Sequence, residues 1–156
     1  MNLRLLLIFL AATLLTPSVF GQKKPNFSGR WWGKATVDYG FGSHDDFEYE
    51  LQLEDKNGII TGISTTTLII RGQRYTAKAE IVGKGNKTLL ICRETHNITE
   101  DRLPESSWVP FEKMELIFRI DNDTPTLEGL YNCGKSPEGR NQGNGRLLLR
   151  KKPPQA

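Results

Sequence analysis

Few side chains in this sequence combine the chemistry of a catalytic or metal-binding group with a useful spacing. Only two histidines occur, His44 and His96, and both fall in predicted loops. His44 is followed by Asp45 and Asp46, but no third ligand is spaced to complete a metal site. Asp121-Asn122-Asp123 is similar to the start of a calcium loop but lacks the Gly and the distal Glu of such a loop. We therefore expect a non-enzymatic protein that uses no metal and no cofactor.

The two cysteines, Cys92 and Cys133, offer redox chemistry instead. In an oxidising compartment a disulfide between them would close a loop of about 40 residues. The alternative is a pair of buried thiols that pack as small apolar side chains. The cysteines form no Cys-x-x-Cys pair and neither lies beside a histidine in sequence. We favour the disulfide.

Residues 1–21 have the pattern of a secretory signal peptide. Arg4 precedes an apolar run from Leu5 to Leu15, which is too short to span a bilayer as a helix. Small residues then lead to Gly21, so we expect cleavage near Gly21 and a secreted or periplasmic protein. No second long apolar run follows, and no transmembrane segment is expected. The formal net charge is only +3 and the charges alternate in sign, which argues against nucleic acid as a partner.

The rest of the chain alternates apolar and polar residues with the period of a β-strand. The clearest run covers residues 46–54, where every second residue from Phe47 to Leu53 is apolar and the others are acidic or polar. Asn57-Gly58 then supplies the positive φ angles of a tight hairpin turn. Eight such runs follow one another, and the longest irregular segment between them is predicted at 95–109.

Eight sequential strands predict an all-β fold, an antiparallel up-and-down barrel over residues 22–152, followed by a disordered tail at 153–156. Closing the barrel would remove the exposed edges of a free meander. The disulfide conflicts with this topology, because Cys92 would lie on the fifth strand and Cys133 on the seventh. Strands two apart are about 10 Å from each other, whereas a disulfide needs Cα atoms within about 7 Å. A β-sandwich is therefore the alternative fold.

The first predicted strand opens with Gly29-x-Trp31, and the last carries Arg146 and Arg150. Together with the eight-strand meander, these residues resemble the calycin superfamily, which includes lipocalins, fatty-acid-binding proteins and avidins. The resemblance implies that Trp31 stacks against Arg146 or Arg150 and closes one end of the barrel, beside Gly29. It carries over no ligand-binding residue, since Trp32 and Gly33 stand where an avidin has an Asn and a Ser for biotin.

The inward face of such a barrel is mostly apolar and carries no predicted charge, which disfavours a charged ligand deep inside. It is either a filled core or a pocket for a small hydrophobic ligand. In the second case, the ligand would contact aromatic residues on five strands. These candidate ligand-binding residues are Trp31, Tyr49, Tyr75, Phe118 and Tyr131.

The sequence thus favours an exported binding protein with a small apolar ligand inside a β-barrel. The main alternative is a protein partner, in the manner of an envelope accessory or inhibitor module that uses the 95–109 loop. A third hypothesis is a carbohydrate binder that uses Trp32 or Trp108. An open cavity would favour the first of these three functions.

Overall fold

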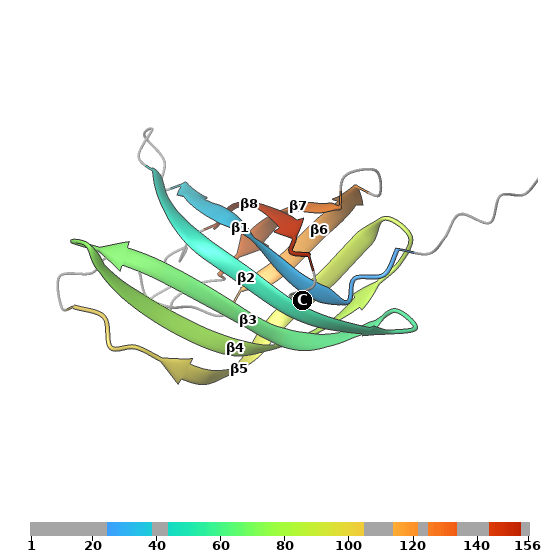
Figure 1. The fold of residues 1–156 in the computed structure, drawn as a ribbon, viewed down its shortest axis with the longest axis horizontal. Coiled ribbons are helices and arrows are strands. Elements are labelled where there is room, and N and C mark those ends of the chain that lie inside the picture. Colours follow the sequence, from blue (N-terminus) through green and yellow to red (C-terminus); the bar gives the residue numbers. More distant parts are fainter. Residues whose placement is uncertain (1–24, 39–43, 105–113, 122–124, 134–143, 154–156) are drawn as a thin grey trace, which may run out of the picture.

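The computed structural model describes residues 25–38, 44–104, 114–121, 125–133 and 144–153. Within these ranges the chain forms eight strands in a closed barrel, each paired antiparallel with its neighbours in sequence (Figure 1). The predicted up-and-down barrel is confirmed, and the β-sandwich alternative is wrong. The strands are β1 (Gly29–Asp38), β2 (His44–Lys56), β3 (Ile59–Ile70), β4 (Gln73–Gly85), β5 (Leu89–Glu100), β6 (Glu115–Asp121), β7 (Thr126–Asn132) and β8 (Asn144–Lys151).

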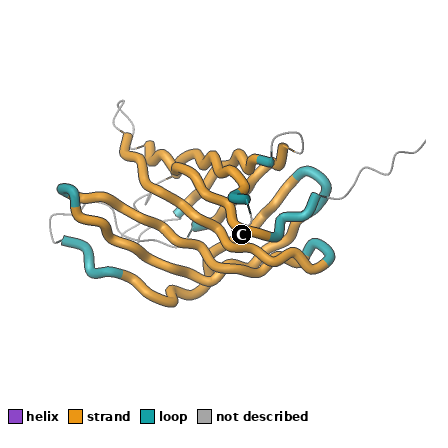
Figure 2. Tube along the Cα trace, viewed as in Figure 1, coloured by secondary structure: helices purple, strands orange, loops and turns teal. Residues whose placement is uncertain are grey.

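The alternation of residue types explains which face of each strand is buried. In β2, Phe47, Tyr49, Leu51 and Leu53 are buried, and the residues between them face outward. Figure 2 shows strands joined by short loops wherever the chain is described, with no helix among them. This arrangement is typical of an antiparallel sheet that has one face in a core and the other in water.

Tight turns hold the long hairpins in register. Asn57 and Gly58 have φ angles of 59° and 88°, as predicted for the turn between β2 and β3. The Asp55 carboxylate accepts a hydrogen bond from the Gly58 N–H at 2.7 Å and so fixes the turn. Arg71 and Gly72 form the next turn, also with positive φ angles.

The barrel closes where β1 meets β8. The two strands pair antiparallel from Trp31 opposite Lys151 to Val37 opposite Gly145. At Gly145 the backbones approach so closely that a Cβ atom would lie 1.8 Å from the carbonyl oxygen of Thr36. Glycine is required there because any side chain would separate the two strands that complete the barrel.

The segment predicted to be irregular at 95–109 is partly strand. β5 continues to Glu100 and pairs with β4 through a register shift near Ala79. Asp101 extends this edge, because its carboxylate accepts hydrogen bonds from the Thr76 N–H and hydroxyl at 2.7 and 3.0 Å. The prediction missed this strand because its alternation is broken at the β-bulge. Residues 105–109, including Trp108, lie outside the described residues.

Candidate functional site

Trp31 belongs to the buried core near one end of the barrel. Its side chain is fully buried, and its indole N–H donates a hydrogen bond to the carbonyl of Phe27 at 2.8 Å. The cation over the indole is Lys151, whose Nζ lies 5.1 Å from the ring centroid. Lys151 also lies against Gly29, whose φ of 120° suits glycine alone.

The prediction that Arg146 or Arg150 stacks against Trp31 is therefore wrong. Both arginines are exposed on the outer surface, because they alternate along β8 with the inward-facing Leu147 and Leu149. A side chain on the outer face of a barrel wall cannot reach an indole inside it. Lys151 can, since it pairs directly with Trp31 at the end of the strand.

A second cation, Lys152, covers Trp32 on the outside of the same end. Its Nζ lies 5.7 Å from the ring centroid and donates to the Glu50 carboxylate at 2.8 Å. Arg30 binds the same carboxylate at 2.6 Å. Partial burial raises the pKa of Glu50, but the hydrogen bonds and charges of Lys152 and Arg30 outweigh this effect and lower it overall. Trp32 is thus 43% exposed, and the ammonium group of Lys152 lies over one face of its ring.

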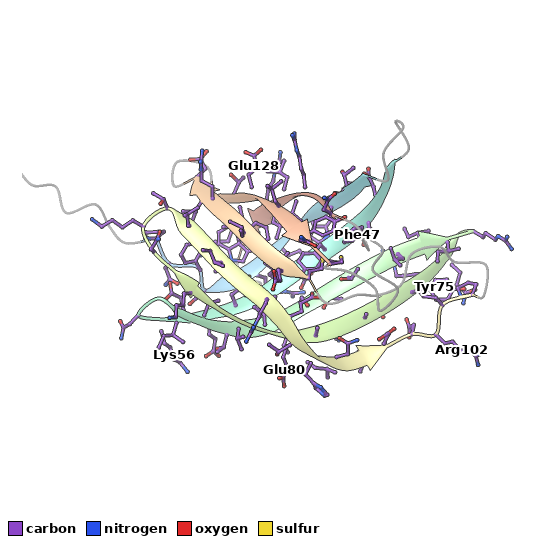
Figure 3. The ribbon with its side chains drawn as sticks, turned by 180° about the vertical axis from the view of Figure 1, so that it is seen from behind. Phe47, Lys56, Tyr75, Glu80, Arg102 and Glu128 are labelled. Carbon is purple, nitrogen blue, oxygen red and sulfur yellow. The ribbon has the colours of Figure 1, made fainter. Side chains whose placement is uncertain are left out.

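Four of the five candidate ligand-binding residues, Trp31, Tyr49, Phe118 and Tyr131, belong to one buried hydrophobic core, and Tyr75 lies outside it. Tyr49 and Tyr131 both pack edge-on against Phe47, at centroid distances of 6.4 and 5.8 Å. Tyr75 is only half-buried and lies near the beginning of β4 (Figure 3).

The interior holds a charge that the sequence analysis missed. Glu94 is only 7% exposed and faces the interior from β5. Its Oε1 accepts hydrogen bonds from the Tyr49 hydroxyl at 2.7 Å and the Ser64 hydroxyl at 2.5 Å. Its Oε2 accepts one from the Met114 N–H at 2.9 Å. The expectation of an uncharged interior is wrong. Glu94 could have been predicted to face inward, because it continues the period-two series of Leu90 and Cys92.

Burial changes the acidity of the groups beside this carboxylate. Desolvation, followed by the charge of Glu94, raises the pKa of Tyr49 well above its ordinary value. The same two causes, in the same order, raise the pKa of the Cys92 thiol to about 12. Both groups therefore keep their protons near neutral pH, and Tyr49 remains a hydrogen-bond donor to Glu94.

An open pocket of about 560 Å³ gives access to Glu94. It lies at the rim where β6 begins and β7 ends, next to β5. Arg93 and Glu115 are the last residues that pair between β5 and β6, and just beyond them the Glu94 N–H donates to the Met114 carbonyl. The pocket is lined by Arg93, Glu94, Thr95, Met114, Glu115, Asn132 and Cys133.

The predicted disulfide is wrong. Cys92 and Cys133 are not bonded to each other, because Cys92 is in β5, Cys133 follows β7, and β6 lies between them. Cys92 is buried and faces the interior, whereas Cys133 is half-buried in the wall of the rim pocket. The conflict between the disulfide and a plain meander is thus resolved in favour of the meander.

Two further observations concern the described residues only. They contain no group of three or more His, Cys, Asp or Glu side chains placed to hold a metal ion. None of their segments is a helix with the length and apolar character needed to cross a membrane. The side chains of His44 and Asp45, and all of Asn122 and Asp123, lie outside the description.

No protein-family model matches this chain, and no curated protein is similar enough to match it. The fold and the rim pocket therefore define a type of architecture. The chain is an eight-stranded antiparallel β-barrel with one packed end and one end that carries a buried carboxylate beside an open pocket.

Proposed function

We propose that this chain is an exported, non-enzymatic binding protein of calycin-like form that holds a small, largely apolar ligand in the open half of its barrel. The observation that carries the proposal is the rim pocket of about 560 Å³, whose lining includes the buried residues Glu94 and Met114. Pockets of several hundred cubic ångströms are typical of sites for small organic molecules.

The change in side-chain size along the barrel supports this proposal. Near Trp31 the interior is filled by large residues such as Phe27, Phe118 and Leu51, all fully buried. Farther along the barrel, the buried residues in the middle of β3 and β4 are small, with Ser64 and Thr66 on one strand and Ala77 and Ala79 on the other, and large residues return at Leu68 and at Phe47 of β2. An eight-stranded barrel has room for one small ligand where its interior side chains are small.

Export and the absence of catalysis are parts of the same proposal and rest on the sequence. The apolar run from Leu5 to Leu15, followed by small residues up to Gly21, supports a secreted or periplasmic location. The polar groups around Glu94 are acceptors and donors suited to binding. No histidine is among the residues that contact Glu94 or line the rim pocket.

Native mass spectrometry of the exported protein, purified without detergent, tests the proposed function. A co-purifying adduct of a few hundred daltons, lost on denaturation, is the expected result. If the bare protein mass is found, and calorimetric titration with decanol and with a fluorescent apolar probe also shows no binding, then the proposal is wrong.

Association through the outer wall is a second candidate function, favoured by a row of exposed apolar side chains. Ile91, Ile117 and Leu130 are direct neighbours across β5, β6 and β7 and are 52%, 52% and 59% exposed. This face replaces the 95–109 loop as the protein-binding surface of that alternative. An outward strand face is normally polar, so such a row indicates a contact surface.

The occupant that the charges favour is a second copy of the chain. On β6, Ile117 lies between Glu115 and Arg119, all three facing outward. A two-fold axis across the strands would place Ile117 on its symmetry mate and each Glu115 against the partner's Arg119. Light scattering after size-exclusion chromatography should show a dimer that Ile117→Lys dissociates, while Ile69→Lys, at an exposed site near the end of β3, has no effect. A monomeric wild type would rule out this alternative.

A further inference from the structure

Glu94 is a buried carboxylate with no cation beside it among the described residues. The four ion pairs found there involve Glu48, Glu50 and Glu54, never Glu94. Its three hydrogen-bond donors, Tyr49, Ser64 and the Met114 N–H, are all neutral. A buried charge is costly unless an opposite charge or a full set of donors compensates it.

The donors leave one position on the carboxylate unused. Two carboxylate oxygens offer about four lone-pair positions in total. Oε1 accepts two hydrogen bonds, from Tyr49 and Ser64, whereas Oε2 accepts one, from the Met114 N–H. The second position of Oε2 is therefore available to a further donor.

The backbone holds the carboxylate firmly in this orientation. The Glu94 N–H donates to the Met114 carbonyl at 2.9 Å, and the Met114 N–H donates back to the Glu94 side chain. β5 and β6 are thus joined at Glu94 just where their regular pairing ends. A carboxylate fixed from both sides is preorganised for an incoming donor and needs no rearrangement to bind it.

The rim pocket connects this acceptor to the outside. Glu94 and Met114 both line it, together with Thr95, Asn132 and Cys133. A ligand in the pocket could therefore place a polar group on Oε2 and direct its apolar part toward Met114, the buried apolar side chain of the pocket lining.

We propose that Glu94 is the recognition residue for a ligand with a protonated amine on an apolar body, the ammonium donating to Oε2 and neutralising the carboxylate. This inference rests on the proposed function, because it names the chemical class of the ligand held in the same half of the barrel. An ammonium adds the attraction of its own positive charge to the hydrogen bond, whereas an alcohol offers only a neutral donor to the same carboxylate. The site would therefore prefer an amine to an alcohol with the same chain.

Calorimetric titration of the purified full-length exported chain with three ten-carbon probes tests the inference. Decylamine, decanol and decanoate have the same apolar part and differ only in the head group. We expect decylamine to bind about tenfold or more tightly than decanol, in line with a hydrogen bond to a charged group. Decanoate should bind weakest, because its carboxylate would meet that of Glu94.

Two variants test whether Glu94 is responsible for the preference for decylamine. Glu94→Gln keeps the shape but not the charge, so decylamine should lose about tenfold or more in affinity and its preference over decanol should disappear. The matched control is Glu128→Gln, an exposed carboxyl on β7 that does not line the rim pocket, which should keep the preference. Circular dichroism checks that each variant is folded. If Glu94→Gln does not fold, the relative affinities of the three probes for the wild type still test the preference for an amine.

The outcomes separate the two proposals. If decylamine and decanol bind equally well, or decanoate binds best, the amine inference is wrong and the binding function stands. If none of the three probes binds, the proposed function fails as well. A preference for decylamine that survives Glu94→Gln would overturn the role of Glu94.

Discussion

At the scale of single residues, burial gives ordinary side chains unusual properties. Glu94 is acidic and inward-facing, and it keeps Tyr49 and Ser64 occupied as hydrogen-bond donors. Cys92 lies two residues earlier on the same face, and Gly83, its partner on β4, leaves no room for a larger neighbour: a Cβ there would lie 2.5 Å from the Cβ of Cys92. The thiol therefore packs as a small core residue.

The raised pKa of Cys92 makes stability depend on alkaline pH. In the unfolded chain the thiol ionises near pH 9, whereas burial, aided by Glu94, raises the pKa of the folded-state thiol to about 12. Between these values the unfolded state releases a proton that the folded state keeps, so stability falls as pH rises. The thiol contributes a slope of about 1.4 kcal/mol per pH unit, and below pH 9 its contribution is fully present.

Urea unfolding of the wild type and of Cys92→Ala, measured from pH 8 to 11, checks this prediction. The variant should be less stable at pH 8, because it leaves a cavity, but should lose less stability per pH unit above pH 9. Cys133→Ala keeps the buried thiol and should follow the wild-type slope. Parallel slopes for the wild type and Cys92→Ala would contradict the assignment.

At the scale of the elements, the end of β8 fastens the packed end of the barrel. Its last residue, Lys151, stacks over Trp31 and donates to the carbonyl of Asn26 at 3.2 Å. Lys152 continues the pairing, with its N–H donating to the carbonyl of Arg30 at 2.8 Å. The C-terminal residues thus join the segment before β1 to the strand that closes the barrel.

Substitutions of Lys151 and Arg150 test which of the two cations stabilises Trp31, the lysine seen in the structure or the arginine that the resemblance to calycins implies. Lys151→Met keeps most of the apolar stem but removes the charge over Trp31, and should lower the free energy of unfolding by about 0.5–1 kcal/mol. Arg150→Met, on the outer face, should change it by less than about 0.5 kcal/mol. Chemical denaturation of both variants provides the measurement. A larger loss for Arg150→Met would show that the arginine, not the lysine, closes the barrel.

At the scale of the whole molecule, stability depends on closure. Each of the eight strands pairs on both sides, and β1 finds its second partner only in β8, more than a hundred residues later in the chain. Without β8, both β1 and β7 would present unpaired backbone groups, which favours aggregation. Leu147 and Leu149, both buried in the core, would also be lost.

Two truncations test the importance of closure. A chain that stops after Gly145 should fail to give a soluble β-barrel, as judged by far-ultraviolet circular dichroism and light scattering. A chain that stops after Lys152 keeps all of β8 together with Lys151 and Lys152, and should melt within a few degrees of the full chain. Soluble, cooperative unfolding of the shorter chain would contradict the importance given to the β1–β8 pairing.

Much of the fold could be predicted from the sequence because period-two patterns are local. Phe47 to Leu53 alternate without interruption, and Asn57-Gly58 encodes its own turn. The prediction lost accuracy where alternation is interrupted, as in the second half of β5, where a register shift separates Ala79 from Ile81. The candidate site was harder to predict, since Glu94 looks like any other acidic residue until its strand is extended past Cys92.

The sequence by itself determined the all-β class, the order of the strands, the burial of Trp31 and most of the inward face, because each depends on residues close together in the chain. The tertiary structure alone decided which cation covers Trp31, that Cys92 and Cys133 lie too far apart to bond, and that Tyr49, Ser64 and Met114 meet at Glu94. These contacts join different strands of the barrel. Their distances follow from the register and closure of the sheet, which no local pattern specifies.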